Sequence, residues 1–210
     1  ADCVFLAVKP QQMRTVVAAV APACADALVV SIAAGIRTAD LSRWLGGHDR
    51  IVRVMPNTPA LIRQGLSAAF PLAGVTEAQR AAVDDLLGAV GKVLWVPAED
   101  ALDGVTALSG SGPAYVFYLI EAMQEAAGRL GFDAESARLM SIQTVLGAAG
   151  LAAQSTEPAA TLRARVTSKG GTTERALQVL EERGAKTAFV DAIEAAAVKS
   201  RELGDAFGKD

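Results

Sequence analysis

The first half of the chain alternates short apolar runs with amphipathic stretches. Three continuous apolar runs have the character of buried parallel strands: residues 4–8, 28–32 and 51–55. Helical spacing follows the first run from Met13 to Val20, ahead of Pro22, and follows the second run from Thr38 to Leu45, which two glycines end. This order predicts a parallel α/β sheet with crossover helices.

Beyond the third run the pattern changes twice. Residues 65–70 (GLSAAF) and 92–97 (KVLWVP) are strand-like and flank an expected helix at 76–90, so we expect the α/β region to end near Pro97. From Glu99 onward there is no convincing strand, and apolar residues recur at helical spacing. We therefore predict an α/β domain at residues 1–98 and an all-helical domain at residues 99–210.

Composition and charge narrow the class of protein. The 51% hydrophobic and 20% charged residues are typical of a compact globular protein. The net charge of -3 comes without a basic stripe, so nucleic acid is not an expected partner. No apolar run approaches the roughly 20 residues of a membrane-spanning helix. Cys3 and Cys24 lie in apolar stretches and are too few for a disulfide framework, so we expect buried thiols and a cytoplasmic protein.

The start of the chain is unusual. It begins only two residues before its first apolar run, in the sequence ADCVFLAVKP. A complete domain rarely starts inside its core, so we expect a fragment or a further segment upstream.

Three loops carry candidate chemistry. AVKP at residues 7–10 and MPNTP at 55–59 follow expected strands, and the ligands of an open α/β sheet bind at the carboxyl edge of its strands. Taken alone, each loop is more simply explained as the end of a strand, because Pro and Asn are ordinary loop residues. The third loop, SKGGTT at 168–173, precedes a helical stretch that ends near Arg183.

The SKGGTT loop has the features of an anion site. Its glycines let the backbone approach a ligand, and the amides of Gly171, Thr172 and Thr173 would open the next helix, where the dipole favours a carboxylate. A plain threonine cap is an equally good explanation from local sequence. SGSGPAY at residues 109–115 repeats this chemistry, with Pro113 near the first turn of a long helix.

Metal and thiol chemistry are not indicated by the sequence. The only histidine, His48, lies in the polar turn GGHDR, where we expect a solvated side chain. No grouping of Cys, His and Asp resembles a metal site, so no metal is expected. Neither cysteine has a base beside it in a recognisable nucleophile motif.

Four segments together resemble one family. RVMPNTPALIRQGLSA, ALSGSGPAYVFYLIEAM, QTVLGAAGL and VTSKGGTTERALQVLEE, in this order and with these spacings, are similar to pyrroline-5-carboxylate reductase, the last enzyme of proline synthesis. The resemblance implies a Rossmann-like dinucleotide-binding domain and an all-α domain that forms a homodimer, with higher oligomers left open. It also implies that the first part of the Rossmann-like domain, with its glycine-rich turn, is absent, so that this chain should bind NADPH poorly.

The resemblance further implies a reaction and the residues that serve it. Hydride passes from NADPH, with NADH left open, to the cyclic imine 1-pyrroline-5-carboxylate and gives L-proline. The family's cofactor positions match Val8, Lys9, Pro10, Ala34 and Asn57. Its substrate positions match Glu99, Ser168, Gly171, Thr172 and Thr173. Thr173 falls near the imine nitrogen as the catalytic hydrogen-bond partner, and Arg165 stands where the family has Asn or Gln.

Two alternatives stay open from the sequence. One is another imine or β-hydroxyacid reductase of the same two-domain layout, although SGSGPAYVF supplies neither the Asp nor the Lys that would favour it. The other is a non-catalytic dimerising scaffold built from the helical domain.

Overall fold

A computed structural model describes residues 1–208 of the 210-residue chain. Contacts divide it into two compact units, one of residues 1–113 together with the segment from Ala192 onward, and one of Ala114–Asp191. The first unit therefore continues past residue 98 to Pro113 and also includes the C-terminal part of the last helix. The boundary that the sequence texture places at 98/99 stays a prediction.

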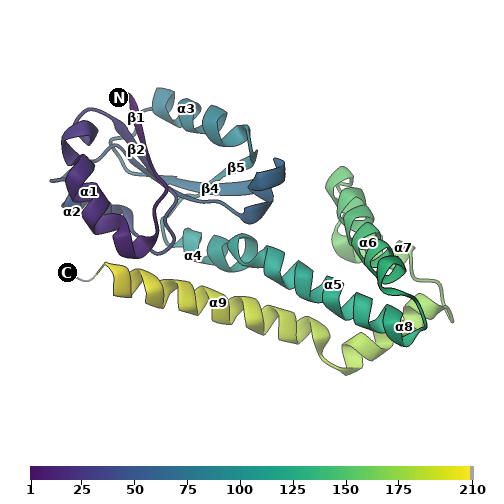
Figure 1. Cartoon of the computed structure of the whole chain (residues 1–210). Coiled ribbons are helices and arrows are strands. Elements are labelled where there is room, and N and C mark those ends of the chain that lie inside the picture. Colours follow the sequence, from purple (N-terminus) through teal and green to yellow (C-terminus); the bar gives the residue numbers. More distant parts are fainter. Residues whose placement is uncertain (209–210) are drawn as a thin grey trace. The chain divides into compact units, whose positions relative to one another are not determined.

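The first unit is built on a five-stranded sheet in the order β1-β2-β3-β4-β5 (Figure 1). The strands are β1 (Cys3–Leu6), β2 (Leu28–Ser31), β3 (Ile51–Met55), β4 (Gly65–Pro71) and β5 (Gly91–Trp95). β1, β2 and β3 run parallel, as the apolar runs predict. β4 runs antiparallel to β3 because the short 3-10 turn η1 (Thr58–Ile62) reverses the chain, and β5 is again parallel to β4.

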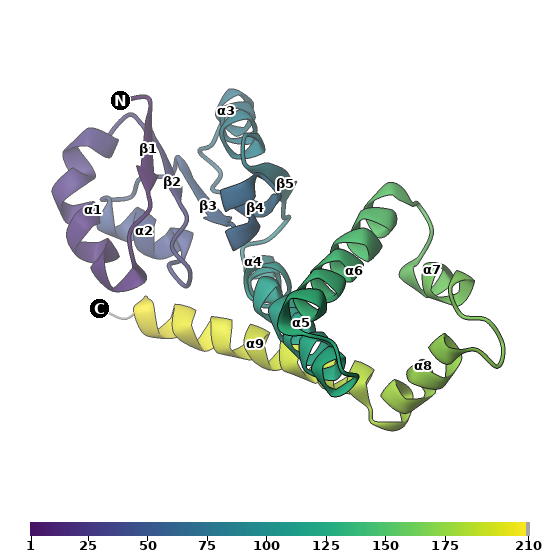
Figure 2. The ribbon, with the colours of Figure 1, turned by 45° about the vertical axis from the view of Figure 1, so that its right-hand side comes forward.

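Helices cover both faces of this sheet. Figure 2 shows α1 (Pro10–Cys24) and α2 (Thr38–Trp44) beside β1 and β2, and α3 (Glu77–Gly88) beside β4 and β5. The predicted end of α1 before Pro22 is wrong, because Pro22 lies inside the helix. Pro22 lies in the last turn of α1, so little helix follows the hydrogen bond that the proline removes. α1 ends two residues later.

Side chains of the strands alternate between two hydrophobic clusters. Val29 and Ile51 belong to the cluster beneath α1 and α2, whereas Val30 and Val52 belong to the cluster beneath α3. This period of two is what a sheet buried on both faces requires.

After β5 the described chain, to residue 208, contains helices and no strand, as expected. They are α4 (Ala101–Val105), the π-helical turn η2 (Thr106–Gly110), α5 (Gly112–Arg129), α6 (Ala134–Gln154), α7 (Ala159–Arg165), α8 (Thr172–Glu182) and α9 (Ala185–Phe207). Among residues 1–208, none of the helices is long and apolar enough to cross a membrane.

The end of α9, which belongs to the first unit, is held by polar contacts with two other helices of that unit. Arg37 donates to the Asp205 carboxylate at 2.7 Å, and this hydrogen bond raises the pKa of the guanidinium. The buried Ser200 hydroxyl lies 2.6 Å from the buried Asp103 carboxylate. The last turns of α9 are thereby held against α2 and α4.

Two expectations about single side chains are corrected. Cys24 is buried, with 1% of its surface exposed, but Cys3 is exposed because it begins the edge strand β1. His48 is half-buried rather than solvated, and its Nε2 lies 3.0 Å from the carbonyl oxygen of Ala27.

Candidate functional site

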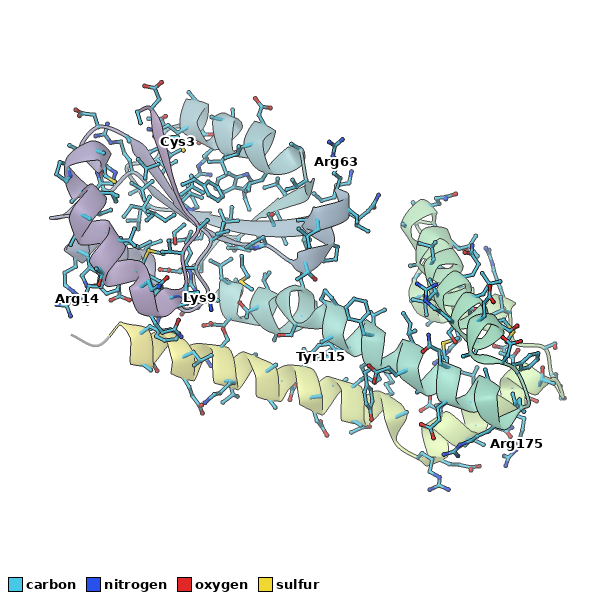
Figure 3. The ribbon with its side chains drawn as sticks, in the orientation of Figure 1. Cys3, Lys9, Arg14, Arg63, Tyr115 and Arg175 are labelled. Carbon is cyan, nitrogen blue, oxygen red and sulfur yellow. The ribbon has the colours of Figure 1, made fainter. Side chains whose placement is uncertain are left out.

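Three predicted cofactor segments follow the three parallel strands. Val8, Lys9 and Pro10 come after β1, Ala34 after β2 and Asn57 after β3. Figure 3 labels Cys3, at the amino end of β1, and Lys9, beyond its carboxyl end and just before α1. Because the carboxyl ends of parallel strands share one edge, the fold brings these segments to one side of the sheet.

A cavity of about 440 Å³ opens at this edge, within the first unit. Pro10 and Ala34 are in its wall, whereas Val8, Lys9 and Asn57 are not. The remaining wall comes from the start of α1, the segment after β2, the region of η2 and the end of α9: Gln11, Gly35, Thr106, Ser111, Ala196, Lys199, Ser200, Leu203 and Phe207. The wall is mostly apolar. The Thr106 hydroxyl, the Ser200 hydroxyl and the Lys199 ammonium in it already have partners in the protein.

Asn57 is not in the wall of this cavity, and both polar atoms of its side chain are hydrogen-bonded within the protein. Its Oδ1 accepts from the backbone N–H of Leu66 at 2.9 Å. Its Nδ2 donates to the hydroxyl and to the carbonyl oxygen of Ser109, at 3.1 and 3.4 Å. The sequence did not reveal Ser109 as a partner, since 52 residues separate it from Asn57.

Glu99 takes part in a polar cluster inside the first unit. One carboxylate oxygen accepts from the Arg53 guanidinium at 2.9 Å and from the Thr38 amide at 2.8 Å, and the other from the Thr38 hydroxyl at 2.6 Å. The Arg53 side chain is 6% exposed and that of Glu99 18%. A substrate contact for Glu99 stays a prediction, and its carboxylate already has three partners.

Arg53 was a signal that sequence reasoning missed. It stands in the buried run IVRVM, and a charged side chain in such a strand requires a partner of opposite charge. Thr38 begins α2, whose own preceding residue, Arg37, supplies no side-chain cap. Glu99 therefore caps α2 from a distance and neutralises Arg53 with the same carboxylate.

The SKGGTT loop belongs to the helical unit and leads into α8. Gly170 has a φ of 73°, in the left-handed region that favours glycine. A Cβ at Gly171 would lie 2.6 Å from the Ser168 Oγ, so the hydroxyl occupies the space that the second glycine leaves. α8 begins at Thr172 and ends at Glu182, close to the predicted end.

The amides of this loop divide into two groups. Gly170 donates to the carboxylate of Glu174 at 2.7 Å, and Gly171 donates to the carbonyl oxygen of Ser168 at 3.0 Å. Thr172 and Thr173 are the first residues of α8, where backbone N–H groups have no partner within a helix. The loop thus already holds one carboxylate of its own, and the Thr172 and Thr173 amides remain for another anion.

Arg165, just before the loop, makes an ion pair with Glu157. The Arg165 guanidinium thus has a partner within the same unit. The resemblance leads one to expect an uncharged amide side chain at this position. Among the described residues, no group of three or more His, Cys, Asp or Glu side chains could hold a metal ion.

The chain is similar to known proteins over nearly its whole length. A family model described as "Pyrroline-5-carboxylate reductase dimerisation" matches residues 99–203. The pyrroline-5-carboxylate reductase of Pseudomonas aeruginosa is 48% identical over 210 residues, which are 100% of this chain and 77% of the relative. That of Pisum sativum is 40% identical over 203 residues, which are 96% of this chain and 74% of the pea protein.

Solved structures agree with these relatives. A pyrroline-5-carboxylate reductase from Coxiella burnetii has a TM-score of 0.91 and 44% identity, and the match covers 97% of this chain and 76% of the other. A Plasmodium falciparum pyrroline carboxylate reductase with NADP bound has a TM-score of 0.90 and 31% identity, covering 97% of this chain and 78% of the other.

Proposed function

The chain belongs to the pyrroline-5-carboxylate reductase family, and we propose that it reduces 1-pyrroline-5-carboxylate to L-proline with hydride from NADPH. The observation that carries the proposal for this chain is the SKGGTT loop, which leaves the Thr172 and Thr173 amides and the Ser168 hydroxyl for a carboxylate. The enzyme is an oxidoreductase of proline biosynthesis.

The carboxyl edge of the sheet fits the nicotinamide end of the cofactor. Ala34 is exposed after β2 and Pro10 begins α1 at the same cavity, whereas the Phe207 ring covers Gly35. We assign Val8, Lys9, Pro10, Ala34 and Asn57 to this cofactor edge. When bound, the dinucleotide supplies hydride to the imine carbon. NADPH is the cofactor supported by the NADP-bound relative, and NADH is the second candidate.

The substrate's carboxylate is assigned to the SKGGTT loop. The Thr172 and Thr173 amides and the Ser168 hydroxyl bind it, whereas the Gly171 amide, bonded to Ser168, shapes the loop. The half-buried Thr173 hydroxyl donates to or accepts from the imine nitrogen. A threonine hydroxyl is too weak an acid to protonate the ring, so the proton arrives with the substrate or through water.

A homodimer is the assembly that the dimerisation model supports. The helical unit exposes large apolar side chains on α5 and α6, including Phe117 (60%), Tyr118 (71%) and Leu151 (68%). Apolar surface of this extent is typical of a subunit interface. We also place the protein in the cytoplasm, which agrees with two cysteines that are both free.

The test is steady-state kinetics on purified enzyme with NADPH and pyrroline-5-carboxylate. Thr173→Ala should lower turnover about tenfold or more, which is ~1.4 kcal/mol in the barrier, and Thr173→Ser should restore part of it. Ser168→Ala should act mainly on KM for the substrate, because a carboxylate contact is made about equally in ground and transition states.

Thr167→Ala is the matched control. The Thr167 hydroxyl donates to the Arg163 carbonyl at 2.7 Å in the same segment, so its loss should affect melting temperature and leave turnover unchanged. No proline formation by the parent enzyme extended upstream with the family's glycine-rich turn would leave a dimerising scaffold as the better account. Unchanged turnover in Thr173→Ala, with a lower melting temperature, would reduce Thr173 to a helix cap worth ~1 kcal/mol.

A further inference from the structure

Asn57 is the only asparagine in the chain, and it links three segments of the first unit. It follows β3, accepts a hydrogen bond from Leu66 at the start of β4, and donates to Ser109 in η2. A ligand contact through Nδ2 would have to replace or share the bonds to Ser109. Its role must therefore be explained through what it holds.

The geometry of η2 explains why Ser109 is available to Asn57. The Ser111 amide donates to the Thr106 carbonyl at 2.8 Å, five residues back, which is the π-helical pattern. Pro113 has no N–H, so the Ser109 carbonyl loses the donor that an α-helix would place four residues later. The Asn57 amide lies in reach of this carbonyl, at 3.4 Å, and of the neighbouring hydroxyl.

A second contact fixes η2 against the same loop. A Cβ on Gly110 would lie 2.6 Å from the terminal methyl of Met55, so the glycine admits the Met55 side chain at the end of β3. The polar and apolar contacts together join the MPNTP loop to η2. On either side of this joint, Thr106 and Ser111 contribute to the wall of the cavity that Pro10 and Ala34 also line.

We infer that Asn57 is a positioning residue that acts through Ser109: the amide fixes η2, and η2 sets the cavity wall at the cofactor edge. This inference rests on the proposed function for the identity of the ligand. The hydrogen-bonded joint itself is independent of it. π-helical turns occur frequently at functional sites, which agrees with such a role.

Kinetics on a double-mutant cycle test the inference. Asn57→Ala should raise KM for NADPH about tenfold, and Ser109→Ala, which keeps the carbonyl, about threefold. The double variant should resemble Asn57→Ala, because both changes break the same joint and their effects do not add. Ser42→Ala in α2 is the matched control and should leave KM for NADPH unchanged. A role in stability alone would lower the melting temperature without changing KM.

Direct binding of cofactor by Asn57 would give a different pattern. Ser109→Ala would then leave KM for NADPH unchanged. This single variant separates the two roles, because the double variant resembles Asn57→Ala in both cases. Either an unchanged KM in Ser109→Ala or a full sum of two independent effects would overturn the positioning role.

A second measurement needs neither activity nor cofactor. Selective ¹⁵N-asparagine labelling of this chain gives one side-chain NH₂ pair, from Asn57. Ser109→Ala should move both resonances and speed their exchange with water, while Ser42→Ala should not. Unmoved resonances would overturn the inference even if Asn57→Ala failed to fold. Moved resonances in a protein that forms no proline would retain the joint and reject the proposed function.

Discussion

Replacing Glu99 separates a structural role from a substrate contact. Its carboxylate receives three hydrogen bonds, one from Arg53 and two from Thr38. Glu99→Ala removes all three and leaves the Arg53 guanidinium, 6% exposed, without its partner. Breaking one side of a buried ion pair costs about 3–5 kcal/mol, so we expect a loss of stability in this range.

Glu99→Gln should cost much less. If the amide oxygen takes the place of Oε1, it still accepts from the Thr38 amide and from Arg53, and the NH₂ group can donate to the Thr38 hydroxyl. Arg53 loses its counter-ion but keeps a hydrogen bond, so we expect about 1–3 kcal/mol, less than for Glu99→Ala. A double variant, Arg53→Met with Glu99→Leu, leaves no unpaired charge and should be more stable than Glu99→Ala.

Urea unfolding followed by tryptophan fluorescence is the assay. The chain has two tryptophans, Trp44 and Trp95, and both lie in the first unit, so the signal reports on the unit that holds Glu99. A loss below about 1 kcal/mol for Glu99→Ala would refute the structural argument. Stability unchanged in Glu99→Gln, together with a raised KM for pyrroline-5-carboxylate, would instead support the substrate contact expected from the family.

Two further predictions concern the helical unit. Hydrogen bonds from the backbone and hydroxyl of Ser136 lower the pKa of Asp133, which caps α6, so its stabilisation is present above the unfolded-state pKa and is lost as pH falls through the folded one. Asp133→Ala should therefore lower the melting temperature at pH 7, and the difference from the parent should vanish in acid; a difference independent of pH would contradict this. Gly171→Ala places a methyl group where the Ser168 hydroxyl lies and should raise KM for the substrate severalfold, measured by kinetics. In a Ser168→Ala background the rise should be smaller but not absent, because the new Cβ would still lie 3.0 Å from the carbonyl oxygen of residue 168; an undiminished rise would contradict the clash with the hydroxyl.

Local pattern predicted the strands and the change to helices after Glu99, but not every helix boundary. The buried strands at residues 28 and 51 begin where continuous apolar runs begin, because a strand covered on both faces has no polar side to alternate with. Thr76 caps α3 through reciprocal hydrogen bonds with Gln79, and the Thr-x-x-Gln spacing of this capping box is visible in the local sequence. The effect of Pro22 was misjudged because it depends on how much helix follows the proline, and α1 continues for only two residues after it.

Long-range polar contacts could not be predicted in the same way. Thr38 and Glu99 are 61 residues apart, and nothing in either local sequence identifies the other. Arg53 in a buried strand indicates that an acidic partner exists but does not identify it. The family resemblance places Asn57 among the cofactor positions, which stays a prediction, and gives no sign that its amide is bonded to Ser109.

The SKGGTT loop shows why a cap and a ligand site are hard to tell apart in sequence. Both use the free amides at the start of a helix, and both favour glycine and threonine. The structure divides these amides: Glu174 engages Gly170, and the Ser168 carbonyl engages Gly171. What remains is narrower than the sequence suggested, namely the first two amides of α8 beside one hydroxyl. Because Glu174 is itself a carboxylate held by the loop, the same electrostatics that favour a bound substrate carboxylate already operate within the chain.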